Sequence, residues 1–290
     1  MNKPKISIIV YDGSFRQRFF QVDSLVKQTL DKDKFEYIFV ENFDTVNPKL
    51  KDKLQDTSLT YKLITLDRNK SYHLGKCANE GVRQSQGDVI IISDADTYFE
   101  PNILEQTLNY HSSNSNSVFY IYRYDEPKPP MLRNLDNITL SVLRSRCELL
   151  NPENYGGFMS ISKDNYIKSG GYSESIYWSG RNSAGAKDLK VRYRNMGLNC
   201  EWSNNLKIYH VCHENSFDSE RWNGFRVESQ WKLINMRKEN GTVKPLIGIA
   251  ENGYGTKRFY ESGEEWEEWL GNFDEKSIGY EYGIRTRMNF

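Results

Sequence analysis

A run of β-branched residues that ends in two carboxylates constrains the fold of this chain more than any other feature. Val89 and three isoleucines lead into the sequence Ser-Asp-Ala-Asp-Thr, which ends at Thr97. Valine and isoleucine pack well on a covered, pleated surface, so this run predicts a buried central strand. Unpaired charge is too costly in an apolar layer, so Asp94 and Asp96 are expected at the strand's C-terminal end. Ligands bind at that edge of open α/β sheets, which predicts a ligand site there.

The chemistry of these two carboxylates favours a divalent cation. Asp94 and Asp96 alternate about a small residue, and Mg²⁺ or Mn²⁺ prefers oxygen ligands together with waters and substrate phosphates. The alternative for the same pair is an Asx-type turn that caps the next element.

Strand-like and helix-like patterns alternate along the first part of the chain. Strands are expected at 5–10, 35–40, 59–66 and 89–97, and helices at 15–30, 48–54, 75–84 and 101–111. Further on, strands are expected at 118–124 and 206–209, and helices at 137–150, 186–196 and 218–238. This order predicts an α/β fold with a mostly parallel central sheet and helices on both faces. The last fifty residues show no clear periodicity.

Composition excludes several classes of protein. The 290 residues carry 39 basic and 39 acidic side chains, so no strong non-specific attraction to nucleic acid or to an anionic membrane is expected. The four cysteines are widely spaced and form no CxxC motif, which favours a reduced, intracellular chain. The apolar run that begins at Ile6 is too short for a signal peptide or a transmembrane span. We therefore expect a cytoplasmic protein, either free or peripheral at a membrane.

The motifs together resemble those of glycosyltransferases of the GT-A fold, closest to the family 2 type. The resemblance extends roughly from Lys5 to Glu214. Its segments are the opening strand and turn, Val40-Glu41-Asn42, Ala78-Asn79-Glu80-Gly81, the DxD-like Asp94-Ala95-Asp96, Gly156-Gly157-Phe158-Met159, Gly170-Gly171-Tyr172-Ser173-Glu174 and Tyr209-His210. It implies a catalytic domain at 1–215, with a nucleotide-sugar-binding half at 1–112 and an acceptor-binding half at 113–215. Residues 216–290 would form a C-terminal extension with a helix and an aromatic-rich tail.

The resemblance also implies roles for the donor-side residues. Asp94 and Asp96 would hold Mn²⁺ or Mg²⁺, Asp94 also meeting the donor, and His210 would complete the metal site. Glu41 would contact the nucleobase, or remain an exposed loop acid. Asp12 either lines the same pocket or stabilises a turn. Lys76 either approaches the diphosphate near a helix start, where anions are favoured, or is a solvated lysine.

The implied reaction is the transfer of a sugar from a nucleoside-diphosphate donor to a glycan or glycoconjugate acceptor. A UDP-sugar is the expected donor, and the stereochemical course is expected to be inverting. A bound metal ion would neutralise the diphosphate leaving group. A base on the far face of the sugar would deprotonate the acceptor hydroxyl.

The catalytic half of the resemblance has one departure. The family's acidic pair falls on Gly185 and Ala186, and neither residue is a base. Asp188 is the nearest carboxylate, and Glu174 is the second candidate. Each has a structural alternative: Asp188 as a helix charge facing Arg192 four residues on, and Glu174 as a turn cap.

Other functions remain open at this point. A GT-A domain that binds nucleotide sugar without transferring it would explain the missing acidic pair. A haloacid-dehalogenase-like phosphatase also uses a hydrophobic run followed by Asp-x-Asp-Thr, but usually on its first strand, whereas three strand candidates precede Asp94 here. A structural zinc site at His210 and His213 is disfavoured because no second Cys/His cluster lies nearby. Trp178 either stacks on an acceptor sugar or is buried.

Overall fold

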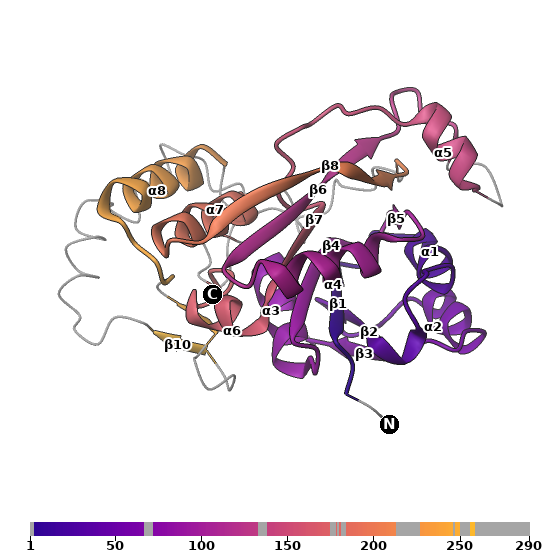
Figure 1. The fold of residues 1–290 in the computed structure, drawn as a ribbon, viewed down its shortest axis with the longest axis horizontal. Coiled ribbons are helices and arrows are strands. Elements are labelled where there is room, and N and C mark those ends of the chain that lie inside the picture. Colours follow the sequence, from indigo (N-terminus) through magenta and orange to yellow (C-terminus); the bar gives the residue numbers. More distant parts are fainter. Residues whose placement is uncertain are drawn as a thin grey trace.

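A computed structural model describes residues 3–66, 72–132, 138–174, 178, 180, 184–212, 227–245, 247–249 and 256–258. These residues form one large sheet with helices on both faces, and a separate two-stranded sheet (Figure 1). The large sheet contains β1 (Ile6–Asp12), β2 (Phe35–Glu41), β3 (Tyr61–Thr65), β4 (Val89–Asp94), β5 (Thr97–Phe99), β6 (Ser117–Asp125), β7 (Phe158–Ser162) and β8 (Asn199–His210). The small sheet pairs β9 (Ile247–Ile249) with β10 (Thr256–Arg258).

The helices are α1 (Phe20–Val26), α2 (Pro48–Gln55), α3 (Leu74–Gln84), α4 (Ile103–Ser113), α5 (Leu140–Arg146), α6 (Lys163–Lys168), α7 (Gly185–Asn195) and α8 (Val227–Asn240). A single 3₁₀ turn, η1 (Lys32–Lys34), precedes β2. Among the residues that the structure describes, no helix has the length and apolarity needed to cross a lipid bilayer.

The large sheet has the strand order β3-β2-β1-β4-β7-β6-β8-β5. Strands β1 to β4 are parallel. The antiparallel β7 joins β4 to β6, and β6 pairs in parallel with β8. Only β7 and the edge strand β5 therefore run against the rest. This confirms the predicted α/β fold, and it brings the C-terminal ends of the other six strands to one edge of the sheet.

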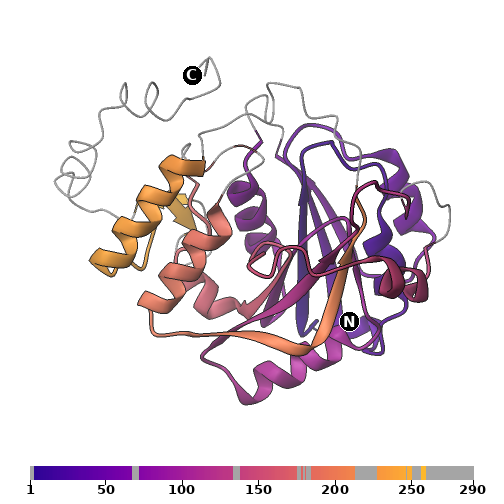
Figure 2. The same cartoon turned by 90° about the horizontal axis from the view of Figure 1, so that it is seen from above.

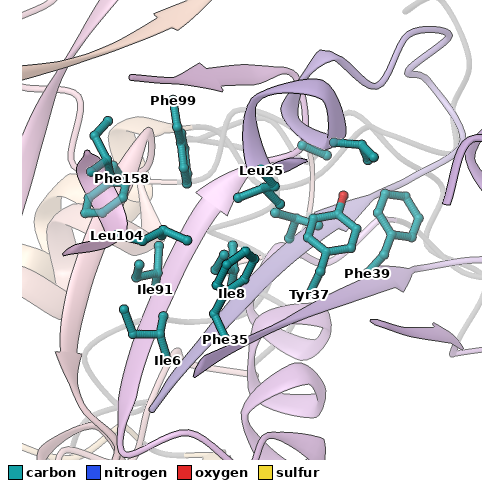
Figure 3. Close-up of a cluster of buried hydrophobic side chains, with 14 of the residues drawn as sticks. Ile6, Ile8, Leu25, Phe35, Tyr37, Phe39, Ile91, Phe99, Leu104 and Phe158 are labelled. Atoms are coloured by element: carbon teal, nitrogen blue, oxygen red, sulfur yellow. The ribbon is translucent and has the colours of Figure 1, made fainter. Parts of the chain in front are cut away.

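Helices lie on both faces of the sheet (Figure 2), and two clusters of buried apolar side chains hold them to it. One face packs against α1, α2 and α4, and Figure 3 shows Ile8 and Ile91 of adjacent strands meeting Leu25 and Leu104 of these helices. The other face packs against α3, α6 and α7, for example through Val82, whose exposed fraction is 0%. Burial on both faces explains why the central strands read as continuous apolar runs rather than alternating ones.

The first helix is much shorter than expected. A helix was predicted at 15–30, but α1 spans only Phe20–Val26. The carboxylate of Asp12 accepts hydrogen bonds from the backbone N–H groups of Gly13 and Arg16, and Glu41 accepts one from Ser14. Side-chain acceptors that capture backbone donors compete with helix formation, so this segment forms a loop around the strand ends.

Two other boundaries also differ from the prediction. The helix expected at 137–150 ends at Arg146, because Glu148 forms a backbone bridge with Asp125. The strand expected at 206–209 begins much earlier, at Asn199. Its pairing with β6 is interrupted by an irregularity opposite Tyr120 and Tyr122, which places a polar Ser-Asn-Asn segment inside the strand. That segment hides the strand's period in the sequence.

Candidate functional site

Polar side chains converge where the parallel strands end. β1, β2, β4, β6 and β8 end in Asp12, Glu41, Asp94, Asp125 and His210. Asp12 is level with Glu41, and Asp125 is level with His210. Thr97, which follows the DxD turn, pairs with His210 because β5 folds back onto β8. The chain therefore brings residues from both of its halves to one site.

Asp94 lies between two guanidinium groups. Its Oδ2 accepts a hydrogen bond from Nη1 of Arg123 at 2.8 Å, and its Oδ1 is 3.7 Å from Nη2 of Arg16. The hydroxyl of Tyr11 donates to the same Oδ1 at 3.3 Å. The carboxylate keeps an exposed fraction of 17%, so it remains accessible from the site.

Asp96 is more deeply buried than Asp94. Its exposed fraction is 4%, and its Oδ2 lies 2.9 Å from Nε of Arg16 and 3.5 Å from Nε2 of His210. A buried carboxylate needs such partners, because desolvation strongly disfavours an unpaired charge. Arg16 thereby links both carboxylates of the Asp94-Ala95-Asp96 motif to Asp12, whose Oδ1 is 3.2 Å from Nη1.

His210 and Asp125 form a second pair beside Asp96. Nδ1 of His210 lies 2.9 Å from Oδ1 of Asp125, which also accepts from Nη2 of Arg123 at 2.9 Å. Burial lowers the pKa of His210, but Asp96 and Asp125 more than offset this, so the pKa is raised overall. Burial raises the pKa of Asp125, yet its bonds to His210 and Arg123 bring it below the usual value. Asp125 thus orients the imidazole toward Asp96.

Asp12 and Glu41 are both buried acids that organise the loop after β1. Burial raises the pKa of Asp12, although Arg16 and two backbone N–H groups oppose the rise. Glu41 accepts hydrogen bonds from the backbone N–H groups of Ser14 and Phe43 at 3.2 and 3.1 Å. Burial, followed by the charge of Asp12, raises the pKa of Glu41 to about 7. Asp12 therefore stabilises a turn, which is one of the two roles predicted for it. The same turn positions Arg16.

Lys76 lies in the first turn of α3, which begins at the same edge of the sheet. Its backbone N–H donates to Nδ1 of His73, the residue that caps this helix. Helix N-termini favour anions, so the position is compatible with the predicted approach to a phosphate. The side chain of Lys76 is half-buried.

The donor chemistry of Asp94, Asp96 and His210 fits a hard or borderline divalent cation. Two carboxylates and one imidazole lie at a single strand edge, and Asp96 and His210 are already adjacent. In the part of the chain that the structure describes, no three His, Cys, Asp or Glu side chains are grouped as a ready ligand set. Each aspartate is instead paired with a guanidinium group, Asp94 with Arg123 and Asp96 with Arg16.

The family of the chain follows from its sequence. Residues 21–170, more than half of the chain, match the family model described as Glycosyl transferase family 2. The chain belongs to this family. The description of that family names glycosyl transfer as the activity of its members. The matched segment contains the DxD turn, Arg123 and Asp125, whereas Asp12, Asp188 and His210 lie outside it.

Solved structures of glycosyltransferases share the GT-A fold. TarS 1–349 of S. aureus in complex with UDP is 17% identical, with a TM-score of 0.54 over 72% of this chain and 60% of that one. Its complex with UDP-GlcNAc is 15% identical, with a TM-score of 0.57 over 82% of this chain and 69% of that one. The mannosyltransferase PcManGT from Pyrobaculum calidifontis, in complex with GDP-Man and Mn²⁺, is 13% identical, with a TM-score of 0.53 over 82% and 62%. No curated protein matches the sequence.

In two of these comparisons the chain spans less than two thirds of the length of the other protein. It spans 60% of the TarS chain with UDP and 62% of the PcManGT chain. At 13 to 17% identity the likeness shows the fold alone.

The expected inverting transfer needs a proton acceptor, and the first candidate, Asp188, is held in a buried ion pair. It lies on α7 with an exposed fraction of 0%, and its Oδ2 accepts from Nε of Arg192 at 2.9 Å. Nη1 of Arg237, from α8, is 2.9 Å from both carboxylate oxygens. These contacts give Asp188 a structural role between two helices. Its assignment as the base stays a prediction.

The second candidate, Glu174, closes a network around α3. Its Oε1 accepts from Nδ2 of Asn79 and Nη2 of Arg83, both at 2.8 Å. The Asn79 side chain also donates to the carbonyl of Tyr172 and accepts from its N–H and from the Tyr166 hydroxyl. The Ala-Asn-Glu-Gly run therefore fastens α3 to the Gly170–Glu174 turn. The base role of Glu174 also stays a prediction.

Two further sequence candidates have clear positions. Trp178 is buried, with an exposed fraction of 2%, and the guanidinium of Arg237 lies 5.5 Å from its ring centroid. The stacking of Trp178 on an acceptor sugar is therefore wrong, and the buried interpretation holds. His213 lies outside the described residues.

The sequence interpretation missed Arg16, Arg123 and Asp125. Asp125 follows a correctly predicted strand, so the rule that drew attention to Glu41 and Asp94 applies to it equally. Arg123 lies two residues earlier, on the same side of that strand. Arg16 gave no such signal, because its segment was expected to be helical.

Proposed function

We propose that this member of family 2 is a glycosyltransferase that moves a sugar from a nucleoside-diphosphate donor, a UDP-sugar, to a glycan or glycoconjugate acceptor with inversion. The observation that carries the proposal is the meeting of Asp94, Asp96, His210, Arg16 and Arg123 at the C-terminal edge of the sheet. The complexes of TarS with UDP and UDP-GlcNAc support a uridine donor, and the PcManGT complex supports a nucleotide sugar in general. A cytoplasmic location is part of the same proposal.

Arg16 and Arg123 supply the positive charge that a diphosphate requires. Guanidinium groups bind phosphate oxygens through paired, charge-assisted hydrogen bonds. Both groups are held by carboxylates, so they are oriented before a donor arrives. A preorganised positive charge stabilises the diphosphate as it leaves the sugar.

Asp94, Asp96 and His210 would hold Mn²⁺ or Mg²⁺. When bound, the ion would act as a Lewis acid toward the diphosphate. Asp125 fixes the direction of His210, and Arg123 would release Asp94 to the ion. The PcManGT complex with Mn²⁺ supports a divalent ion in this fold.

Glu41 is suited to a nucleobase contact. With a pKa of about 7 it exists in both protonation states near neutral pH. The protonated acid donates to a base carbonyl, and the carboxylate accepts from a ring N–H. Asp12 and Lys76 complete the proposed donor pocket, while Asp188 and Glu174 remain the proposed proton acceptors.

A thermal-shift titration with UDP, UDP-GlcNAc, UDP-glucose and GDP-mannose, with and without Mn²⁺, tests the donor site. A nucleotide at about 100 times its Kd stabilises the folded state by about 2.7 kcal/mol, which is roughly 5–10 °C in melting temperature. We expect the largest shift with a UDP-sugar and Mn²⁺.

The Asp96→Asn variant should fold and lose the Mn²⁺-dependent part of this shift. Asp23→Asn, which removes a surface carboxylate paired with Lys53, serves as the control and should keep the full shift. If no nucleotide changes the melting temperature of the unmodified protein, or if Asp96→Asn responds like it, the assigned donor site is wrong.

A further inference from the structure

A cluster of aromatic rings, in which Tyr122 and Trp202 are half-buried and Tyr155 is buried, lies beside the Gly156-Gly157 turn. Tyr122 of β6 stacks on Trp202 of β8 with ring centroids 4.6 Å apart and planes 17° apart. Tyr155, which immediately precedes the turn, lies 5.3 Å from the same indole. Flat rings of this kind pack against the apolar faces of sugars as well as against each other.

Three cationic side chains of α7 line the same cluster. Lys187, Lys190 and Arg194 are spaced three and four residues apart, so they share one face of the helix. The ammonium of Lys190 lies 4.0 Å from the Tyr155 ring centroid and contacts its hydroxyl. Burial lowers the pKa of Lys190, and the charge of Arg194 lowers it further.

The positive charge of this group is only partly balanced. Glu153 pairs with Lys187 at 3.0 Å, at a carboxylate that is 64% exposed. Like charges that crowd one helix face cost free energy until an anion offsets them. We call Tyr122, Tyr155, Trp202, Lys187, Lys190 and Arg194 the aromatic–cationic platform.

The platform lies directly next to the proposed donor site. A Cβ placed on Gly157 would come within 3.0 Å of the Arg123 side chain, which holds Asp94. A Cβ on Gly156 would meet Ala186 at 3.8 Å, at the start of α7. The glycine turn therefore packs against Arg123 on one side and near the start of α7 on the other, so it lies between the Asp94 site and the helix that carries Lys187 and Lys190.

We propose that the aromatic–cationic platform binds the acceptor, and that the acceptor is a glycan that carries carboxylate or phosphate groups. The half-buried rings of Tyr122 and Trp202 provide apolar surface for the sugar units, and Lys187, Lys190 and Arg194 provide charge for the anionic groups. This assignment rests on the proposed transfer reaction and adds the class of acceptor to it.

Two matched pairs of glycans test the platform. One pair is a hyaluronan hexasaccharide and its carboxyl-reduced form, and the other is pentamannosyl phosphate and its dephosphorylated form. We expect at least one anionic member to bind about tenfold more tightly than its neutral partner, and its affinity to fall with ionic strength. Calorimetry measures binding, and tryptophan fluorescence reports contact with the indole of Trp202.

The Lys187→Gln/Lys190→Gln variant should lose about tenfold in affinity for the preferred glycan. Lys49→Gln/Lys53→Gln is the control: these lysines lie on α2, and Lys53 matches Lys187 in exposure, at 32% against 30%, and in having one carboxylate partner. A Trp202→Phe variant should retain binding, whereas Trp202→Leu should weaken it.

Three results would overturn the assignment: no preference for either anionic glycan, unchanged binding by Lys187→Gln/Lys190→Gln, or tighter binding of a single-stranded RNA 10-mer than of any glycan. UDP binding is measured on the same samples. If the unmodified protein does not bind UDP, the proposed donor site is wrong. If it binds UDP but no anionic glycan, only the assignment of the platform is wrong.

Discussion

Arg123 joins Asp94 to Asp125, and so couples the end of β4 to the end of β6. Replacing it with glutamine removes one of the two guanidinium groups that we propose for the diphosphate. We expect Arg123→Gln to weaken UDP binding by about tenfold or more, because a charge-assisted hydrogen bond contributes about 1.5–3 kcal/mol. The variant also frees Asp94, so Mn²⁺ alone should bind at least as tightly as to the unmodified protein.

Calorimetric titrations with UDP alone and with Mn²⁺ alone separate these two effects. Arg83→Gln is a matched control, since Arg83 is similarly buried and also bridges two carboxylates, those of Glu80 and Glu174. A parallel loss of UDP affinity in both variants would mean that Arg123 has no specific place in the donor site.

Glu41 should make stability depend on pH. The unfolded chain releases this proton near pH 4.5, whereas the folded chain holds it until about pH 7. Between these values the folded state binds more protons, so the free energy of unfolding should fall as the pH rises, by up to about 3 kcal/mol. Glu41→Gln mimics the protonated acid and should show a flatter profile between pH 5 and 8.

Urea unfolding at several pH values measures this profile. Glu105→Gln replaces an exposed acid and should leave it unchanged. Because Asp12 also has a raised pKa, some of the slope should persist in Glu41→Gln. An identical slope in Glu41→Gln and the unmodified protein would show that Glu41 is ionised throughout.

Residue patterns predicted the acids of the site better than its cations. Asp94, Asp96 and Glu41 follow apolar runs, and the cost of burying charge places such residues at strand ends. Arg16 reaches the site because Asp12 and Glu41 divert the chain from a helix; the Asp12 contact is local, whereas the Glu41 contact joins segments distant in sequence. No local pattern contains that information.

At the scale of elements, the pairing of α7 with α8 depends on one buried carboxylate. Asp188→Asn would leave Arg192 and Arg237 facing each other without their shared counter-ion. Removing one partner of a buried ion pair costs about 3–5 kcal/mol, so we expect a marked loss of stability in urea unfolding. Asp23→Asn breaks a surface pair and should cost less than about 1 kcal/mol.

The same variant separates the structural from the catalytic role of Asp188. A base would be lost without change in stability, so transfer should fall while unfolding stays the same. A purely structural role predicts the opposite: the free energy of unfolding should fall, while transfer by the molecules that remain folded stays the same. Glu174→Gln, measured in parallel, tests the second candidate base.

The boundaries of helices and strands were predictable where residues within the segment, or directly beside it, determine where it begins and ends. α2 and α3 begin and end within a residue or so of their expected limits, and each has a local cap, at Asn47 and His73. α5 stops early because Glu148 pairs with a distant strand, and β8 is extended by a partner that the sequence does not identify. The short edge strand β5 was not predicted, because it forms only by folding back onto β8.

At the scale of the whole molecule, the proposed donor site is shared by both halves of the sheet. Asp12, Glu41 and Asp94 end strands before β5, whereas Asp125 and His210 end strands after it. A donor that contacts both sets should slow local opening of both. We expect UDP with Mn²⁺ to slow amide hydrogen exchange at the ends of β1 and β4 and also at the ends of β6 and β8.

Hydrogen exchange read out by mass spectrometry distinguishes this from a site in one half. Peptides from η1, which precedes the N-terminal end of β2 and so lies at the opposite edge of the sheet, serve as the internal control. Protection confined to the peptides of β1 and β4 would mean that the second half takes no part in donor binding.

The turn that presents Asp96 also ends the large sheet. β5 has only three residues and covers Ile208–His210 of the much longer β8. Gln21 and Thr97 anchor this return, through hydrogen bonds that also reach the carbonyl of Asp94. An uncovered strand edge is a template for pairing with another chain. Insertions between Asp94 and Thr97 should therefore promote self-association and disrupt the proposed donor site, so that the turn that carries Asp96 also protects the edge of the sheet.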